Sequence, residues 1–96
     1  MLVLITYDVN TTTAEGKRRL RNVAKKCVAH GTRVQNSVFE CLLDNTQLKL
    51  LRHELEQIID TSCDSLRIYV LGNNYHGKVT HIGAKDTYEP EGSLIL

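Results

Sequence analysis

One carboxylate stands where the first strongly apolar segment of the chain ends. Residues 2–5 are four consecutive large apolar residues, and the polar triplet Thr6-Tyr7-Asp8 follows them. The apolar run predicts a strand buried on both faces, so Asp8 would emerge at the end of that strand. A carboxylate leaving water without a partner is costly. Asp8 is therefore either an acid that caps a turn or a metal ligand, and the residues alone leave both open.

A magnesium site at Asp8 would need more than one copy of the chain. Mg²⁺ takes six oxygen ligands, usually one or two carboxylates together with water and phosphate oxygens. No second acid lies near Asp8 in the sequence. A two-fold dimer would supply one by placing two Asp8 residues across its axis. Metal chemistry is therefore expected to require a homodimer that shares one Mg²⁺ or Mn²⁺ at the axis.

Positive charge is concentrated in the first part of the chain. The net charge is only +1, yet residues 1–39 carry seven basic and two acidic residues, and residues 40–96 carry five basic and nine acidic ones. All seven basic residues lie between Lys17 and Arg33, with no acid among them. A solvated helix face is the common explanation, but such faces usually mix both signs. The uninterrupted run favours a surface for a phosphate backbone.

Two other side chains allow both a structural and a functional interpretation. Ser37 is a hydroxyl nucleophile in principle, but no neighbouring His or Lys motif supports that role, and a turn hydroxyl is the simpler explanation. Phe39 is the single Phe of the chain and lies in a strand-like run. It would belong to the core or to an interface, with stacking on a nucleic-acid base as the alternative.

The elements that must position these residues follow the order β-α-β-β-α-β. A helix is expected from the capping-box pair Thr12 and Glu15 to Gly31, with Gly31 as its C′ residue. Residues 33–43 are strand-like with a polar break at 35–37, which fits either a tight hairpin or one bent strand. A second helix follows the capping segment 44–46, and residues 65–71 form the last strand, with Leu66 and two further apolar residues on one face.

This order predicts an α+β, ferredoxin-like fold in which two helices cover one face of a four-stranded antiparallel sheet. The 96 residues make one domain, with a core at about 1–72 and an appendage at about 73–96. The appendage has strand-like pieces at 78–82 and 94–96. Its apolar end is expected to add a strand on a dimer partner, whose sheet would also cover the second face.

The sequence argues against a membrane-spanning or a secreted protein. No segment is long and apolar enough to span a membrane, and the N-terminus lacks the charged region of a signal peptide. The three cysteines show no CxxC or zinc spacing, which favours reduced thiols. The expected location is the cytoplasm, and no membrane contact is expected.

Three segments together resemble CRISPR-associated protein 2. They are the N-terminal Leu-Ile-Thr-Tyr-Asp-Val, the arginine-rich first helix, and the run Arg-Val-Gln-Asn-Ser-Val-Phe-Glu at residues 33–40. The strand end is a weak signal by itself, but its combination with the second motif is specific. The resemblance covers the whole chain, and residues 88–96 also resemble the tail of the type I-C branch.

The resemblance implies a homodimer in the adaptation step of CRISPR immunity, where new spacers are acquired. In that step the homodimer would bridge dimers of the CRISPR-associated protein 1 integrase and hold the DNA. It also implies a metal-dependent endonuclease acting on double-stranded DNA or RNA. The family's catalytic and metal-binding acid corresponds to Asp8. Its nucleic-acid-binding positions correspond to Tyr7, Arg18, Arg19, Arg33, Ser37 and Phe39, with the nearby Arg21 leaving some uncertainty of register within the helix.

Two other functions compete with the nuclease. A non-catalytic DNA-binding scaffold would use the same basic helix, and a VapD-type ribonuclease toxin would share the fold. The basic helix and the apolar C-terminus fit the nuclease and the scaffold better than they fit the toxin. The sequence does not separate DNA from RNA as the preferred substrate.

Overall fold

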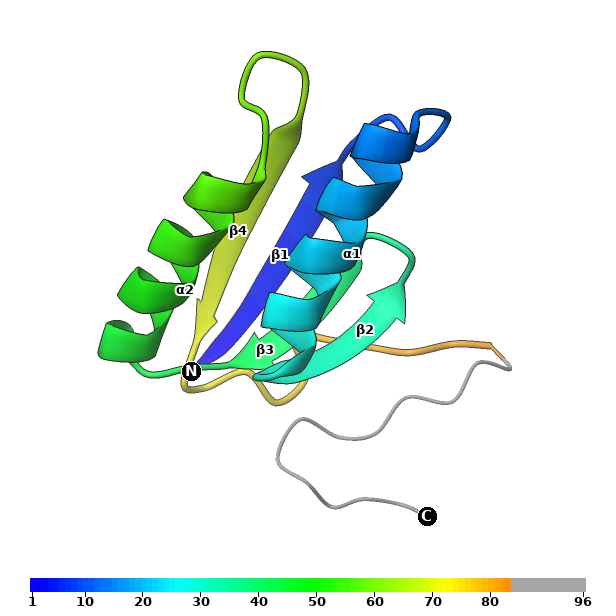
Figure 1. Ribbon diagram of the computed structural model, residues 1–96. Coiled ribbons are helices and arrows are strands. Elements are labelled where there is room, and N and C mark those ends of the chain that lie inside the picture. The colour runs from blue at the N-terminus through cyan, green and yellow to red at the C-terminus, as the bar shows by residue number, and fades with distance from the viewer. Residues whose placement is uncertain (84–96) are drawn as a thin grey trace.

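A four-stranded antiparallel sheet with two helices on one face forms the structured part of the chain (Figure 1). The structure, a computed structural model, describes residues 1–83. The strand order is β2-β3-β1-β4. The elements are β1 (Leu2–Asp8), α1 (Ala14–Val28), β2 (Gly31–Gln35), β3 (Val38–Leu42), α2 (Asn45–Ile58) and β4 (Ser65–Gly72). The predicted ferredoxin-like α+β fold is confirmed.

The core lies between the sheet and the helices because alternate residues of β1 face them. Val3, Ile5 and Tyr7 are buried there, as the strand period of two requires. The apolar stripes of the helices meet them at helical spacing. The buried helix residues with apolar side chains are Leu20, Val23, Ala24, Cys27, Leu51 and Leu55. The three cysteines are free thiols, with Cys63 exposed and the other two buried.

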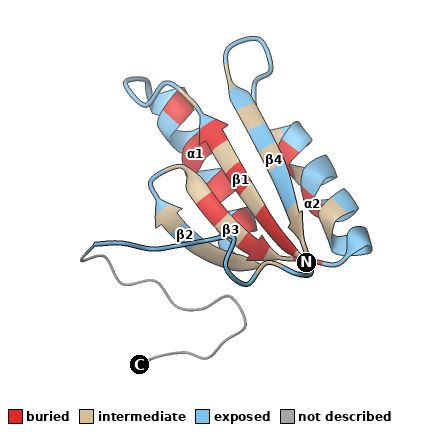
Figure 2. Ribbon diagram, turned by 180° about the vertical axis from the view of Figure 1, so that it is seen from behind, coloured by how far each residue is buried: buried red, intermediate tan, exposed pale blue. Residues whose placement is uncertain are grey.

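The other face of the sheet is turned away from both helices. On β1 it carries Leu4 and Thr6, which are half-buried, and then the exposed Asp8. Figure 2 views the molecule from this side, where exposed and half-buried positions interrupt the buried ones along the strands. The first strand is therefore apolar on both faces near its start and polar at its end, which places the carboxylate at the sheet's rim.

Residues 33–43 belong to a hairpin, which resolves the alternative that the sequence left open. β2 ends at Gln35, β3 begins at Val38, and the two residues between them form a tight turn. Strand β2 already begins at Gly31, earlier than expected. The pairing shifts register between Arg33 and Gln35, so the hairpin contains an irregularity where the polar residues interrupt the apolar pattern.

The helix caps agree with the sequence in one case and differ by one residue in the other. The second helix begins after Asp44, whose carboxylate accepts from the Gln47 amide at 2.7 Å in a full capping box. The first helix is capped by Thr13 rather than Thr12, because the Thr13 hydroxyl accepts from the Gly16 amide at 3.0 Å. Three consecutive threonines at 11–13 make this position ambiguous in the sequence.

Gly31 is not the helix-terminating residue that the sequence suggested. The helix closes at Ala29, and Gly31 starts β2 without a positive φ. A Cβ at position 31 would lie 1.9 Å from the Glu40 carbonyl oxygen on the neighbouring strand. Glycine is required here by the close approach of two backbones, not by a left-handed turn.

The chain beyond β4 differs from the expectation where the structure describes it. Residues 78–82 form no strand; instead a turn joins the Lys78 amide to the Tyr75 carbonyl at 3.0 Å. The expected strand at 94–96 and its packing on a partner lie outside the described residues. Within residues 1–83, none of the helices has the length and apolar character needed to cross a bilayer.

Candidate active site

Asp8 lies in a depression of about 520 Å³ at the rim of the sheet. Its carboxylate is exposed, and its backbone pairs with Ser65 at the start of β4. The depression is formed where the end of β1, the β2–β3 turn and the start of β4 come together. Its lining residues are Thr6, Tyr7, Asp8, Ser37, Ser65, Arg67 and Tyr69.

Strand β4 contributes residues that sequence reasoning did not assign to the site. Arg67 pairs with Thr6 across the strands and donates from Nη1 to the Tyr69 hydroxyl at 3.2 Å. This hydrogen bond holds the pKa of Arg67 above its ordinary value. The signal was present in the sequence: if Leu66 and Ile68 face the core, Ser65, Arg67 and Tyr69 must face the other way. Only the strand order puts them beside Asp8.

Ser37 is brought to Asp8 by the hairpin turn. Its carbonyl accepts from the Tyr7 amide at 2.9 Å, which ties the turn to the end of β1. Ser37 lines the same depression as Asp8. Among residues 1–83, no histidine or lysine lines that depression to activate a serine nucleophile, so a role in orienting a ligand suits the Ser37 hydroxyl better than attack.

Behind the depression, on the helix side of the sheet, Tyr7, Arg19 and Asp64 form a buried network. The Asp64 side chain is 0% exposed and that of Arg19 is 20% exposed. Asp64 Oδ2 accepts from Arg19 Nε at 2.8 Å and from the Tyr7 hydroxyl, and Oδ1 accepts from Arg19 Nη2 at 3.2 Å. Arg19 thus binds the carboxylate with two nitrogens, the strong geometry for this pair.

The electrostatics of this network favour an ionised carboxylate. Burial alone would raise the pKa of Asp64, but hydrogen bonds from Arg19 and Tyr7 outweigh it and bring that pKa to about 2. Burial, together with the Asp64 carboxylate, raises the pKa of Tyr7 well above its ordinary value. The hydrogen bond to Asp64 also raises the pKa of Arg19. At neutral pH the network contains one anion, one cation and a neutral phenol.

Tyr7 and Phe39 do not reach a surface in the structure. Their exposures are 2% and 0%, and both belong to the core beneath the helices. Phe39 pairs with Ile5 on one side and with Arg33 on the other. The structure therefore gives both aromatic residues packing roles. We do not include them in a proposed nucleic-acid interface, because a buried ring cannot stack on a base.

The three remaining positions, all arginines, differ in how free they are. Arg33 is exposed, but its Nε donates to the Asn36 carbonyl at 2.7 Å and its guanidinium carbon lies 5.7 Å from the Phe39 ring centroid. Arg19 is committed to Asp64, as described above. Arg18 is exposed on α1, and within residues 1–83 no carboxylate forms an ion pair with it. Of the predicted arginines, Arg18 is therefore the one most open to a phosphate.

Figure 1 shows that α1 begins at the same end of the molecule where β1 finishes and β4 starts. The exposed basic residues of α1 begin at this end and continue along the helix. They are Lys17, Arg18, Arg21, Lys25 and Lys26. Lys26 is bound to Glu54 of α2 at 2.8 Å. The end of β1 that carries Asp8 and the start of the basic helix α1 thus lie at the same end of the molecule.

The metal-binding capacity of one chain is small. Among the described residues no group of three or more His, Cys, Asp or Glu side chains could hold a metal ion. Asp8 offers one exposed carboxylate, with two serine side chains beside it. One carboxylate fits Mg²⁺ only where water, phosphate oxygens or a second chain complete the six ligands.

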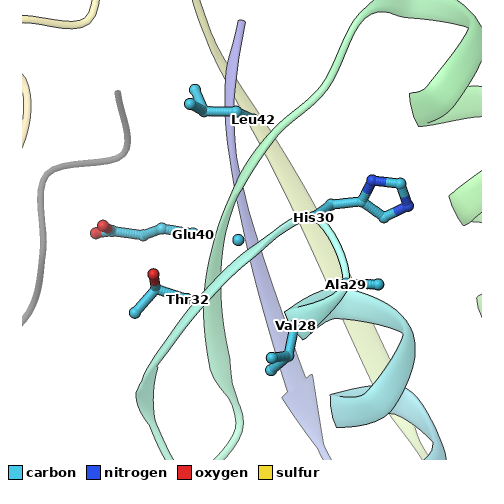
Figure 3. Close-up of a pocket in the computed structure, with 7 residues that line it drawn as sticks. Val28, Ala29, His30, Thr32, Glu40 and Leu42 are labelled. Carbon is cyan, nitrogen blue, oxygen red and sulfur yellow. The ribbon is translucent and has the colours of Figure 1, made fainter. Parts of the chain in front are cut away.

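A second hollow, of about 370 Å³, lies where the end of α1 meets β2 and β3. Figure 3 shows that its side chains do not converge: Thr32 and Glu40 extend to one side of the hairpin, whereas His30 extends to the other. We assign no chemistry to this hollow, since an acid and an imidazole that point apart cannot act on one group.

Comparison with known proteins identifies the family. The family model described as CRISPR associated protein Cas2 matches residues 1–79. The chain belongs to the Cas2 family. This confirms the resemblance that the sequence motifs indicated.

Curated and solved relatives agree with this assignment. A relative from Halalkalibacterium halodurans, named CRISPR-associated endonuclease Cas2, is 61% identical over 96 residues, 100% of both chains. A relative from Chlorobaculum tepidum, named CRISPR-associated endoribonuclease Cas2, is 55% identical, again over 100% of both chains. The crystal structure of Streptococcus pyogenes Cas2 has a TM-score of 0.80 and 53% identity, covering 86% of this chain and 100% of that one.

Proposed function

We propose that this Cas2-family protein is a metal-dependent endonuclease that hydrolyses phosphodiester bonds in DNA or RNA. The observation that carries the proposal is an exposed carboxylate, Asp8, in a depression that also contains an arginine and two serines. A metal-assisted site for phosphodiester hydrolysis uses a ligand for the ion and a cation that offsets phosphate charge. The names of the relatives from H. halodurans and C. tepidum support this function.

In this mechanism the residues of the depression have separate tasks. Asp8 would hold Mg²⁺ or Mn²⁺, which when bound lowers the pKa of a water ligand and offsets phosphate charge. Arg67 lies on the same face and would contact the phosphate oxygens, with its guanidinium oriented by the Tyr69 hydroxyl. The Ser37 and Ser65 hydroxyls would orient the ligand by hydrogen bonds.

A homodimer is part of the proposal. One exposed carboxylate per chain gives a weak metal site, and a two-fold axis beside the depression would bring a second Asp8 to the same ion. Light scattering at micromolar concentration should give twice the chain mass. A stable monomer that still cleaves nucleic acid would exclude a shared ion.

The experiment that tests the function is an Asp8→Asn variant assayed for cleavage and for binding. Cleavage of DNA and RNA, tested side by side with Mg²⁺ or Mn²⁺, should fall by about 100-fold or more, as is typical when a group that stabilises transition-state charge is removed. Nucleic-acid affinity and the dimer should stay as in the wild type, because the basic face of α1 is unchanged. Undiminished cleavage would assign the activity to another residue.

The runner-up function is a non-catalytic scaffold that holds DNA for the CRISPR-associated integrase during spacer acquisition. The exposed basic face of α1 favours it, because Arg18 and Arg21 can bind phosphates of any sequence. Activity and scaffolding predict different outcomes. A wild-type protein that binds DNA tightly but cleaves neither DNA nor RNA with any divalent metal would favour the scaffold alone.

A further inference from the structure

We propose that Asp64 is a positioning residue for the candidate site, and that Arg19 acts through it rather than on nucleic acid. Asp64, Arg19 and Tyr7 would fix the strand ends that carry Asp8 and Ser65. This inference rests on the proposed nuclease function, which it deepens by naming the residues that hold the carboxylate in place.

Both carboxylate oxygens of Asp64 have hydrogen-bond partners. Its side chain is fully buried, yet its two oxygens receive five hydrogen bonds from three parts of the chain, one of them from the neighbouring Cys63 thiol at 3.6 Å. Two come from Arg19 on α1, one from Tyr7 on β1, and one from the Asp60 amide at 3.0 Å in its own loop. A buried carboxylate is tolerated only with such partners. The network therefore joins α1, β1 and the α2–β4 loop at one point.

The network of Tyr7, Arg19 and Asp64 lies next to the candidate site. Tyr7 immediately precedes Asp8, and Asp64 immediately precedes Ser65. Asp8 and Ser65 are paired across β1 and β4. Because side chains alternate along a strand, the network lies on the helix side of these strand ends and the depression on the other side. Strand ends fray readily, and here the network fastens both of them just behind the carboxylate.

Two consecutive arginines of α1 differ in exposure and in their partners. Arg19 is 20% exposed and binds Asp64 with two nitrogens, so its guanidinium is already satisfied by a carboxylate. Arg18 is exposed and has no ion-pair partner among residues 1–83. Moving Arg19 to a phosphate would leave the Asp64 carboxylate buried and unpaired, which is strongly unfavourable.

The experiment is a double-mutant cycle with Asp64→Asn and Arg19→Gln in the full-length protein. Each single variant should lower kcat by about 10-fold or more, since small misplacement of a reacting group has effects of this size or larger. KM and nucleic-acid affinity should stay within about two-fold of wild type, because neither residue touches substrate. The double variant should be no worse than the poorer single one, since the two residues act as a unit.

Two controls separate positioning from loss of stability. Glu54→Gln removes the acceptor of a different ion pair of α1, Lys26–Glu54, and should leave kcat unchanged. Val23→Ala removes buried volume from α1 and should lower Tm but leave kcat unchanged well below that Tm. If Asp64→Asn does not fold, Tyr7→Phe removes a single hydroxyl from the network and should lower kcat without changing KM.

A second measurement keeps failure of this inference distinct from failure of the proposed function. Titration with Mn²⁺, followed by NMR, should broaden the amide signals of Ser37 and Ser65 at lower Mn²⁺ concentration in wild type than in Asp64→Asn. If wild type cleaves nothing, the nuclease proposal fails and this titration alone decides the positioning role. Equal Mn²⁺ dependence, wild-type kcat in a folded Asp64→Asn variant, or a drop in affinity on adding Arg19→Gln to Asp64→Asn would overturn the inference.

Discussion

Lowering the pH should reduce the free energy of unfolding more in the wild type than in Asp64→Asn. Only the wild type has the buried ionised carboxylate of Asp64, which acid protonates. The pKa of Asp64 is about 2 in the folded chain against an ordinary value of 3.8. The difference corresponds to about 2 kcal/mol of stability, at 1.36 kcal/mol for each pH unit. Because the folded pKa is the lower one, this contribution is fully present above about pH 5 and is lost as the pH falls toward 2.

The measurement is urea unfolding of both proteins from pH 7 to pH 2 at one fixed protein concentration, since dimer formation would make stability depend on concentration. The difference in unfolding free energy between wild type and Asp64→Asn should shrink by about 2 kcal/mol across this range. Other carboxylates titrate in both proteins and cancel in the comparison. Glu54→Gln serves as the exposed control and should show a much weaker pH dependence of its difference.

A difference that stays constant from pH 7 to pH 2 would refute the reasoning, since Asp64 would then be ionised or neutral alike in the folded and unfolded chains. A difference that grows in acid would mean that the folded chain favours the protonated carboxyl. Either result would contradict the account of Arg19 and Tyr7 as donors to a carboxylate.

Three further outcomes follow from the structure. Gly31→Ala should destabilise the fold by about 2 kcal/mol in urea unfolding, because its Cβ would meet the Glu40 carbonyl at 1.9 Å; wild-type stability would contradict the close approach. Replacing Arg18 and Arg21 with Gln should weaken binding equally on all sequences and reduce the slope of log affinity against log salt by about 1 for each phosphate that is no longer bound. Arg67→Gln should lower kcat by about 100-fold while leaving Mn²⁺ binding unchanged, and equal loss of both would make it a structural residue.

Much of the fold could be predicted because the spacing of apolar residues along the sequence distinguishes strands from helices. The buried alternation of Val3, Ile5 and Tyr7 and the helical stripe through Leu20 and Val23 specify strand and helix directly. The errors are local and have physical causes. The three threonines before α1 are equivalent as caps until the backbone is placed, and the need for Gly31 arises from a neighbouring strand that the sequence does not identify.

Only the part of the candidate site that lies on the first strand could be predicted from the sequence. Asp8 emerges at the end of an apolar strand, so its exposure is visible in the sequence. The contributions of Ser65 and Arg67 depend on β4 lying next to β1, which is a property of the strand order. The buried partner Asp64 lies in a polar loop, where nothing in the local sequence distinguishes it from the exposed Asp60.

Arg18 and Arg19 show that not every residue of a basic run is available to bind nucleic acid. Arg19 stands four residues before Val23, a buried position of α1, so helical spacing puts it at the border of the apolar stripe. Arg18 lies outside that border and is exposed. A guanidinium at the border can reach either a phosphate or a buried acid. Which of the two it binds depends on whether the α2–β4 loop places an acid beside it. Asp64 lies there and binds Arg19 behind the candidate site, whereas the exposed Arg18 has no ion-pair partner among residues 1–83.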